Sequence, residues 1–262
     1  VSLNNETKEV KMVSVYRDLL AKQEDDAIKK ANHAYFVGGP LQAINVLNRN
    51  FDLDIEDYVT VDFKVMIEIV DLLGGVDIDV TEEEATEANR YLDAIATEVG
   101  KKFQAKKIKA GSQNLNGVQT LTYSRIRKNV GGDYARTERQ RLVIQKLAEK
   151  AKQIDLTTLN NMIDTVFPQI STSFELKEMF GLAAHAMQYE LGESRGFAFE
   201  YTDGSVEGLG SVVIPLGHVE NVQELHAFLY PEEEYSPSDT VKKIAQEIEK
   251  LNFLTYFELK RN

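Results

Sequence analysis

The sequence contains no cysteine and no tryptophan among its 262 residues, and only five prolines. The absence of cysteine excludes disulfide bonds, thiolate metal sites and a cysteine nucleophile. The four histidines never occur as a close pair, which argues against a histidine-based zinc site. No run approaches the 18 consecutive apolar residues of a membrane-spanning helix, so the sequence itself predicts none.

Basic residues are outnumbered by acidic ones, 30 to 42, which gives a formal net charge of −12. This balance argues against a protein that binds duplex DNA, unless its basic residues are clustered. The hydrophobic content of 43% and the charged content of 27% are typical of a globular chain. We predict one domain over residues 1–251 and a C-terminal tail over residues 252–262.

Hydrophobic spacing indicates alternating strands and helices. Strands are expected at 9–15, 58–63, 76–80, 196–201 and 211–216. Helices are expected at 41–51, 63–73, 115–128, 137–154, 156–167, 174–189, 219–229 and 238–250, with a helical surface excursion over 82–110. The strand–helix–strand order over 58–80 indicates a βαβ unit with parallel strands. The expected fold is α/β, with a mixed central sheet covered by helices on both faces.

The segment 118–142 is rich in basic residues, although the chain as a whole is acidic. This segment contains Arg125, Arg127, Lys128, Arg136, Arg139 and Arg141 but only two acidic residues, Asp133 and Glu138. The arginine guanidinium is a rigid fork of donors that matches phosphate oxygens. The glycine pair 131–132 precedes a predicted helix start near Asp133, where free N–H groups and the helix dipole favour an anion.

The spacing of these residues suggests that several converge. Arg136 and Gln140 lie four residues apart and therefore share a helix face. Arg125 and Arg127 point the same way if the chain between them is extended. The segment predicts a site for phosphate or pyrophosphate. The alternative is a solvated basic helix surface, a description that fits Arg141 and Lys146.

Two further residues are weaker candidates. Arg17 directly follows the predicted strand 9–15, and the carboxyl ends of strands line the usual ligand crevice of open α/β sheets. Its alternative role is a surface salt bridge. His33 could act as a base, but a structural histidine that bonds to the loop backbone is the more economical interpretation.

Several ordered segments together resemble the LytR-CpsA-Psr family of cell-envelope proteins. They are MVSVYRD (12–18), NHAYFVGGPLQAI (32–44), VDFKVMIEIVDLLGGVDIDV (61–80), LNGVQTLTYSRIRK (115–128), GDYARTERQRLVI (132–144), VIPLGHVENVQELHAFLYP (213–231) and YSPSD (235–239). Their order and spacing cover most of the chain.

The resemblance implies an α/β/α sandwich that holds a polyprenyl pyrophosphate glycan carrier in an apolar lipid groove. It implies a phosphotransferase that moves a glycopolymer, such as a capsule or teichoic acid, onto peptidoglycan. Such proteins are membrane-anchored and act on the extracellular face of the cytoplasmic membrane in Gram-positive cells, with no nucleic-acid partner. The alternatives are a non-catalytic module that binds the carrier, or an envelope-linked transcriptional attenuator.

The resemblance also implies roles for particular residues. The residues expected to hold the pyrophosphate are Arg17, Arg125, Arg127, Arg136 and Gln140, with Asp133 beside it. Of these residues, Arg17, Asp133 and Arg136 are expected to be catalytic. The residues expected to line the lipid groove are Val65, Ile67, Leu72, Leu121, Val143 and Leu147.

Two features depart from the family pattern. Tyr16 stands where the family usually has proline, so the turn that presents Arg17 is expected to differ. The family takes its Mg²⁺-binding carboxylates from segments that precede the strand at 9–15, so no metal ligand is expected in this chain. Mg²⁺ is the expected cofactor, the anchor is expected upstream of Val1, and a chain without those carboxylates is expected to turn over weakly or not at all.

Overall fold

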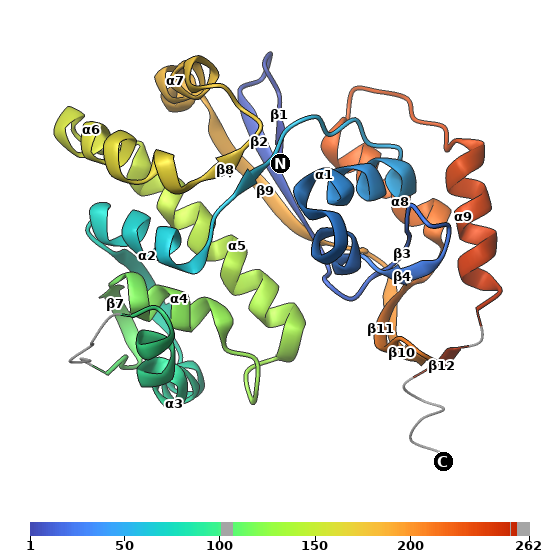
Figure 1. Cartoon of the computed structure of the whole chain (residues 1–262), viewed down its shortest axis with the longest axis horizontal. Helices are drawn as coiled ribbons and strands as arrows, with labels where there is room; N and C mark the ends of the chain where they lie inside the picture. The colour runs from blue at the N-terminus through green and yellow to red at the C-terminus, as the bar shows by residue number, and fades with distance from the viewer. Residues whose placement is uncertain (101–106, 252, 256–262) are drawn as a thin grey trace. The chain divides into compact units, whose positions relative to one another are not determined.

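The computed structural model describes residues 1–100, 107–251 and 253–255, which divide into two compact units (Figure 1). The terminal unit comprises Val1–Tyr58 and Gly192–Asn262, and the central unit comprises Val59–Leu191. Both units mix helices with small sheets, so the α/β class is confirmed. Within the described residues, no helix combines the length and the apolar character needed to cross a membrane.

The terminal unit contains two three-stranded sheets and a hairpin. One sheet has the order β1 (Ser2–Leu3), β2 (Glu9–Val15) and β9 (Glu190–Phe197). In the other, β10 (Tyr201–Val206) lies between β11 (Gly210–Pro215) and β12 (Phe253–Thr255) and is antiparallel to both. The hairpin pairs β3 (Leu20–Lys22) with β4 (Ile28–Lys30). The predicted strand at 196–201 is wrong, because β9 ends at Phe197 and a new strand begins at Tyr201.

Three helices belong to this unit: α1 (Asn32–Phe51), α8 (His218–Leu229) and α9 (Asp239–Glu249). Helix α1 begins nine residues before the predicted start at 41 and is kinked at Gly38 and Gly39. The kink has a local cause, because Gly39 takes a positive φ of 66° and is followed by Pro40. Part of the predicted tail, Phe253–Thr255, pairs with β10 as β12, while residues 252 and 256–262 lie outside the described part of the chain.

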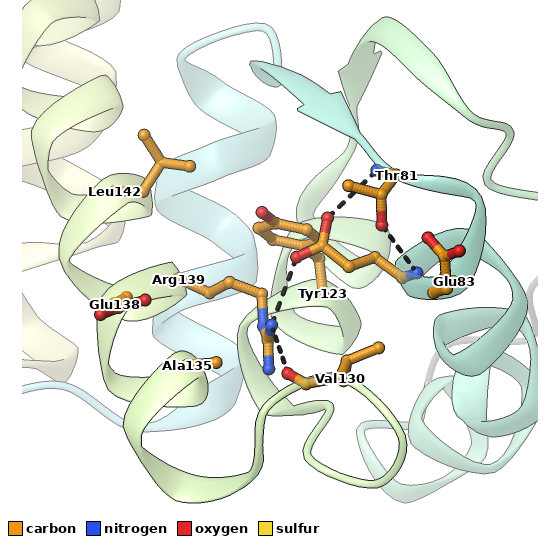
Figure 2. Close-up of a pocket in the computed structure, with 9 residues that line it drawn as sticks. Thr81, Glu83, Tyr123, Val130, Ala135, Glu138, Arg139 and Leu142 are labelled. Atoms are coloured by element: carbon orange, nitrogen blue, oxygen red, sulfur yellow. Dashed lines mark hydrogen bonds and ion pairs between the residues drawn. The ribbon is translucent and has the colours of Figure 1, made fainter.

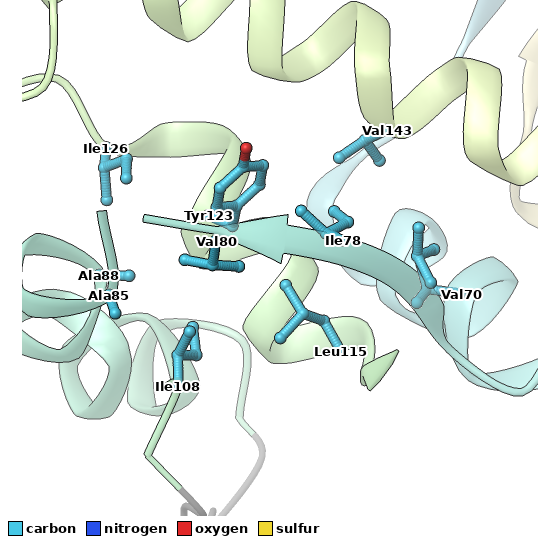
Figure 3. Packing of buried hydrophobic residues seen from close by; sticks show 11 residues of the cluster. Val70, Ile78, Val80, Ala85, Ala88, Ile108, Leu115, Tyr123, Ile126 and Val143 are labelled. Carbon is cyan, nitrogen blue, oxygen red and sulfur yellow. The ribbon is translucent and has the colours of Figure 1, made fainter. Parts of the chain in front are cut away.

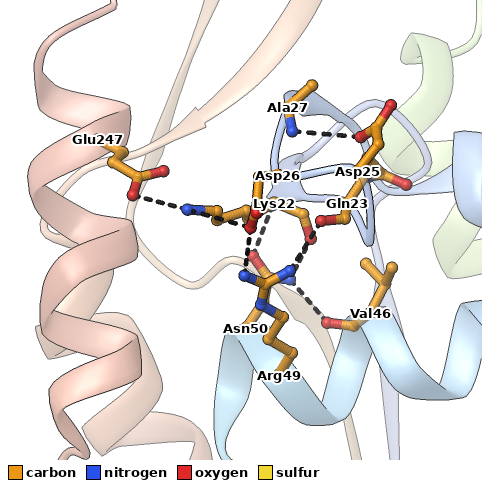
Figure 4. Close-up of polar contacts among 9 residues, drawn as sticks. All are labelled: Lys22, Gln23, Asp25, Asp26, Ala27, Val46, Arg49, Asn50 and Glu247. Atoms are coloured by element: carbon orange, nitrogen blue, oxygen red, sulfur yellow. Dashed lines mark hydrogen bonds and ion pairs between the residues drawn. The ribbon is translucent and has the colours of Figure 1, made fainter.

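A polar network ties the β3–β4 hairpin to α1 and α9 (Figure 4). The side chain of Asn50 is fully buried, and its amide exchanges hydrogen bonds of 2.7 and 2.8 Å with the backbone of Lys22. The Lys22 ammonium pairs with Glu247 on α9 at 2.7 Å, and Arg49 pairs with Asp26 at 2.5 Å. Because a buried amide without partners is costly, this network fixes where the hairpin lies.

His218, at the start of α8, is buried and lies against the end of α1. Its Nε2 is 3.1 Å from the carbonyl oxygen of Asn50, and its ring lies 5.9 Å from that of Phe51. A carbonyl only accepts, so Nε2 carries the proton in the neutral ring. Burial lowers the pKa of His218 below its ordinary value of 6.5, and the hydrogen bond to Asn50 offsets this only in part.

This burial makes folding stability depend on pH. The unfolded chain binds a proton at His218 more readily than the folded one, so stability is fully present above pH 6.5 and falls as the pH drops below that value. We expect the free energy of unfolding of the wild type to fall from pH 7 to pH 5 more steeply than that of His218→Gln. Urea unfolding of both proteins at several pH values measures this difference, and parallel pH profiles would contradict it.

The central unit is mainly helical. Its helices are α2 (Phe63–Leu72), α3 (Glu82–Glu98), α4 (Gly117–Arg125), α5 (Gly132–Ala151), α6 (Leu156–Thr165) and α7 (Leu176–His185). Its strands are β5 (Val59–Thr60), β6 (Val76–Val80), β7 (Gly111–Leu115) and β8 (Ser171–Thr172). Short 3₁₀ turns follow α6 at Phe167–Gln169 and α7 at Ala186–Gln188. Residues 101–106, the middle of the predicted surface excursion, lie outside the described residues.

Helix α2 begins and ends where the sequence predicts. The carboxylate of Asp62 accepts a hydrogen bond of 2.8 Å from the backbone N–H of Val65, which caps the first turn. At the other end Gly75, with φ of 86°, donates its N–H to the carbonyl of Val70. The chain is thereby reversed directly into β6.

The predicted parallel βαβ unit is wrong. Strand β5 pairs antiparallel with β8, and β6 pairs antiparallel with β7, so the two predicted partners lie in different sheets. Along β6 the residues are alternately buried and exposed, with Asp77 and Asp79 facing outward. One solvated face is typical of an antiparallel pair, whereas parallel strands are buried on both faces.

The core of this unit forms around the buried face of β6 (Figure 3). Val76, Ile78 and Val80 project from the strand into it. The residues from neighbouring elements that complete it are Val70, Ala85, Ala88, Ile108, Leu115, Tyr123, Ile126 and Val143. Helix α5 is thus held against β6 and α4 by Val143, and its remaining faces are available for polar groups.

Candidate functional site

Two of the predicted arginines meet on one carboxylate. Asp133 Oδ1 lies 3.0 Å from Nε of Arg127 and 2.8 Å from Nη2 of Arg136. Arg127 lies in the loop before α5, and the other two residues lie in the first turns of that helix. We call Arg127, Asp133 and Arg136 the arginine–aspartate cluster. The cluster leaves an excess of positive charge at the N-terminus of a helix of 20 residues.

The start of α5 suits an anion. The helix begins at Gly132, inside the predicted loop at 129–135, and the preceding Gly131 has φ of 84° and offers no side-chain cap. The Gly132 N–H is used by the carbonyl of Arg127, which closes the loop onto the helix. First-turn N–H groups without a side-chain cap are the groups that bind phosphate at helix N-termini.

Arg136 is the most buried member of the cluster. Its side chain is only 10% exposed, and it forms an ion pair with Asp133, which is itself about half exposed. Its Nε is buried and has no hydrogen-bond partner among the described residues. A buried donor without an acceptor costs free energy, so an anion that supplied acceptor oxygens here would be bound favourably.

Arg125 and Arg127 lie on either side of Ile126, whose backbone is extended. Both arginines line one cavity of about 410 Å³, and the expectation that their side chains point the same way stays a prediction. We call it the α3–α4 cavity; it is lined by Tyr91, Ala94, Ile95, Glu98, Thr122, Arg125, Ile126, Arg127 and Lys128. Arg125 pairs with Glu98 at 3.1 Å, and its guanidinium lies 4.3 Å from the ring centre of Phe63.

Gln140 lies one turn beyond Arg136 on α5. Its Nε2 is 3.4 Å from the carbonyl of Ser124, so its amide reaches the end of α4 next to Arg125. The structure therefore brings Arg125, Arg127, Asp133, Arg136 and Gln140 to neighbouring positions where α4 ends and α5 begins. The sequence analysis missed two contacts in this region, those of Glu98 and Phe63 with Arg125.

Arg17 belongs to the terminal unit, whereas the arginine–aspartate cluster belongs to the central unit. It follows β2 and is about half exposed, with its guanidinium 3.7 Å from Asp18. The preceding Tyr16 donates its backbone N–H to the carbonyl of Phe197 at 2.8 Å, a bond that proline could not make. The expected difference in this turn therefore has a physical basis. The role of Arg17 stays a prediction.

Arg139 has a structural role. Its side chain is 6% exposed and pairs with Glu84 on α3 at 3.2 Å, and its Nη1 donates to the carbonyl of Val130 (Figure 2). Its Nη2 donates to the carbonyl of Ile126 at 2.7 Å. Burial and the charge of Glu84 raise the pKa of Tyr123, which lies beside this pair, to about 12. These residues line a cavity of about 470 Å³ whose polar groups bond mainly to one another.

Two other basic residues of α5, Lys146 and Arg141, differ in whether they fit a solvated basic helix surface. Lys146 pairs with the exposed Glu149, as expected for a solvated helix face. Arg141 is half-buried, and its Nη1 is buried without a partner among the described residues, so the solvated description does not fit it. His33, in the terminal unit, lies 3.4 Å from the ammonium of Lys29, and its role as a base stays a prediction.

The residues predicted to line a lipid groove are mostly packed in cores. Val65, Ile67, Leu121 and Val143 are at most 2% exposed. Ile67 and Leu121 pack together in a cluster with α3, and Leu147 lies against the β6 core. Leu72 lines a separate small cavity with Lys150 and Asp155. An apolar groove formed by these six residues stays a prediction.

Carboxylates do not assemble into a metal site in the part of the chain that the structure describes. No group of three or more Asp, Glu or His side chains converges there. Asp133, the carboxylate nearest the arginines, already accepts from both Arg127 and Arg136. The residues present therefore do not by themselves fit a Mg²⁺ ion.

The fold and the cluster define an α/β protein with two arginines paired to one carboxylate at a helix N-terminus. Comparison with known proteins identifies the family. The sequence model of the LytR_cpsA_psr family matches residues 1–224, which include all of the central unit and part of the terminal unit, and the chain belongs to this family.

Two curated relatives illustrate the similarity. The chain is 29% identical over 185 residues to Biofilm regulatory protein A of Streptococcus mutans, which covers 67% of this chain and 43% of the relative. It is 28% identical over 220 residues to polyisoprenyl-teichoic acid–peptidoglycan teichoic acid transferase TagV of Bacillus subtilis, covering 76% and 54%. The chain thus spans about half the length of these relatives.

Solved structures share the fold. A structure described as a transcriptional regulator from Enterococcus faecalis matches with a TM-score of 0.74 at 22% identity, covering 95% of this chain and 87% of that one. A structure described as TagT bound to LIIa-WTA matches with a TM-score of 0.70 at 21% identity, covering 87% and 81%. A structure described as B. subtilis TagT matches with a TM-score of 0.68 at 20% identity, covering 87% of this chain and 82% of that one.

Proposed function

We propose that this protein transfers a glycopolymer from a polyprenyl pyrophosphate carrier onto peptidoglycan. The observation that carries the proposal is Arg136, a buried cation with an unused Nε donor at the start of α5, paired through Asp133 with Arg127. Family membership and the transferase named among the relatives support the same activity.

The arginines would act by holding and neutralising phosphate oxygens. The hydroxyl oxygen of the acceptor sugar attacks the phosphorus next to the glycan, and the bond from that phosphorus to the bridging oxygen breaks. Polyprenyl phosphate leaves with the bridging oxygen, and the acceptor proton passes to a base, for which Asp133 is the candidate in the cluster. Fixed guanidinium donors lower the barrier because charge grows on the leaving oxygen.

We propose Mg²⁺ as the cofactor, with ligands other than the residues described above. When bound, the ion would neutralise charge on the pyrophosphate. In the described part of the chain, no three Asp, Glu or His side chains come together to hold it.

The proposed partners are the polyprenyl-linked glycan and peptidoglycan. Both belong to the extracellular face of the cytoplasmic membrane, which we propose as the site of action, with a membrane anchor outside the described residues. Gln140 is proposed to extend the pyrophosphate site from the third turn of α5. The role proposed for Arg17, which the family resemblance implies, is also to contact phosphate oxygens.

Ligand binding tests the proposal directly. We expect a short-chain polyprenyl pyrophosphate to bind at least about tenfold more tightly than the corresponding monophosphate, because the second phosphate adds charge-assisted hydrogen bonds of roughly 1.5–3 kcal/mol each. Calorimetry with both lipids and with inorganic pyrophosphate measures this. Equal affinity for the two lipids would contradict a pyrophosphate site.

Product release separates the transferase from a non-catalytic binding module. A transferase supplied with a glycan-bearing carrier, peptidoglycan fragments and Mg²⁺ releases polyprenyl phosphate, whereas a binding module or attenuator retains the carrier intact. The net charge of −12 argues against the DNA-binding alternative.

A further inference from the structure

The α3–α4 cavity continues directly from the arginine–aspartate cluster. Arg127 belongs to both, because its Nε contacts Asp133 while its side chain also lines the cavity. The opposite wall is one face of α3, formed by Tyr91, Ala94, Ile95 and Glu98 at helical spacing. A group attached to a phosphate held by Arg127 would therefore have this cavity beside it.

The lining of the cavity combines apolar and charged residues. Ile95 and Ile126 are buried, while Tyr91 is 41% exposed and has an accessible apolar surface. Four charged residues also line the cavity: Glu98, Arg125, Arg127 and Lys128. The volume of about 410 Å³ falls within the range of roughly 300–1,000 Å³ typical of small-ligand sites.

This combination matches a sugar better than a lipid chain. A sugar ring has an apolar C–H face that packs on an aromatic ring, and hydroxyl groups that both donate and accept hydrogen bonds. Glu98 can accept from such hydroxyls and Arg125 can donate to them, because their ion pair is partly exposed. An apolar chain would have to cover four charged groups without replacing their hydrogen bonds to water, which is costly.

We propose that the α3–α4 cavity holds the sugar residue attached to the carrier pyrophosphate, with Tyr91 as the aromatic surface on which that sugar packs. This inference rests on the proposed function, since the sugar reaches the cavity only if its phosphate lies on Arg127. It assigns the glycan end of the carrier to the α3 side of the arginines.

The test compares two ligands that differ only in the sugar. The probes are farnesyl pyrophosphate and farnesyl pyrophosphate carrying one hexose, titrated calorimetrically into wild type, Tyr91→Ala and Tyr91→Phe. We expect Tyr91→Ala to lose about fivefold or more in affinity for the hexose-bearing probe and to bind the sugar-free probe like the wild type. Tyr91→Phe, which keeps the ring, should retain most of the affinity for both.

Controls separate the possible failures. Asp93→Ala alters an exposed side chain of α3 that does not line the cavity, so both affinities should stay at the wild-type value. If Tyr91→Ala binds both probes like the wild type, or loses both equally, the sugar assignment is overturned while the pyrophosphate site stands. If the wild type binds neither probe, the proposed function fails and the inference fails with it.

Discussion

Arg136→Ala should weaken binding of a short-chain polyprenyl pyrophosphate by about ten- to a hundredfold, while Lys146→Ala leaves the affinity unchanged. The loss corresponds to one charge-assisted contact, roughly 1.5–3 kcal/mol. Arg136 has a buried, unused donor beside the N-terminus of α5, whereas Lys146 on the same helix pairs with an exposed glutamate. Calorimetry on the three proteins measures the difference.

The conservative variant sharpens this test. Arg136→Lys keeps a positive charge but loses the planar fork, so it should bind more weakly than the wild type and more tightly than Arg136→Ala. Unfolding midpoints show whether each variant is folded at the titration temperature. Equal losses for Arg136→Ala and Lys146→Ala would mean that the arginines act only as a diffuse basic surface.

Arg139→Met should lower the free energy of unfolding by about 3–5 kcal/mol, which is the usual cost of removing one partner of a buried ion pair. The guanidinium that is lost neutralises the largely buried Glu84 and donates to the carbonyls of Ile126 and Val130, so all three groups would lose this partner. Urea unfolding at pH 7 measures the change. Lys146→Ala, which removes a surface pair on the same helix, should be close to wild type.

The double variant Arg139→Met/Glu84→Gln tests the cause of that loss. Because it also removes the buried negative charge, it should recover part of the stability lost by Arg139→Met alone. It also provides a folded protein if the single variant does not fold. A double variant that is less stable by the full sum of two independent losses would show that the two side chains do not interact.

Local signals in the sequence predicted the helices of the central unit well. Asp62 before α2 and the glycines after it are caps that act through neighbouring backbone groups, so they are readable without the fold. The predicted parallel pairing of 58–63 with 76–80 was wrong, because the actual partners of these strands lie far away in the sequence, at 171–172 and 111–115. The alternation of Val and Asp in β6 was the available signal for a strand with one solvated face.

The sequence indicated which residues of the candidate site to consider, but not which residues of other helices they contact. The arginines of residues 125–136 could be recognised because phosphate chemistry favours that residue type and the helix start favours an anion. The contact between Arg125 and Glu98 joins residues 27 positions apart, and the burial of Arg139 depends on Glu84, 55 positions away. Neither can be derived from spacing along one helix, since both depend on how α3 packs against α4 and α5.

Asp133 affects which anions the arginine–aspartate cluster is expected to bind. Its Oδ1 already accepts from both Arg127 and Arg136, so an incoming anion must compete with a carboxylate that is covalently tethered three residues from Arg136. We therefore expect chloride or a singly charged phosphate ester to compete poorly, because each brings little charge and few acceptors. We expect a ligand with several phosphate oxygens to bind both guanidinium groups and to reach the unused Arg136 donor as well, so that affinity follows ligand valence and not simply negative charge.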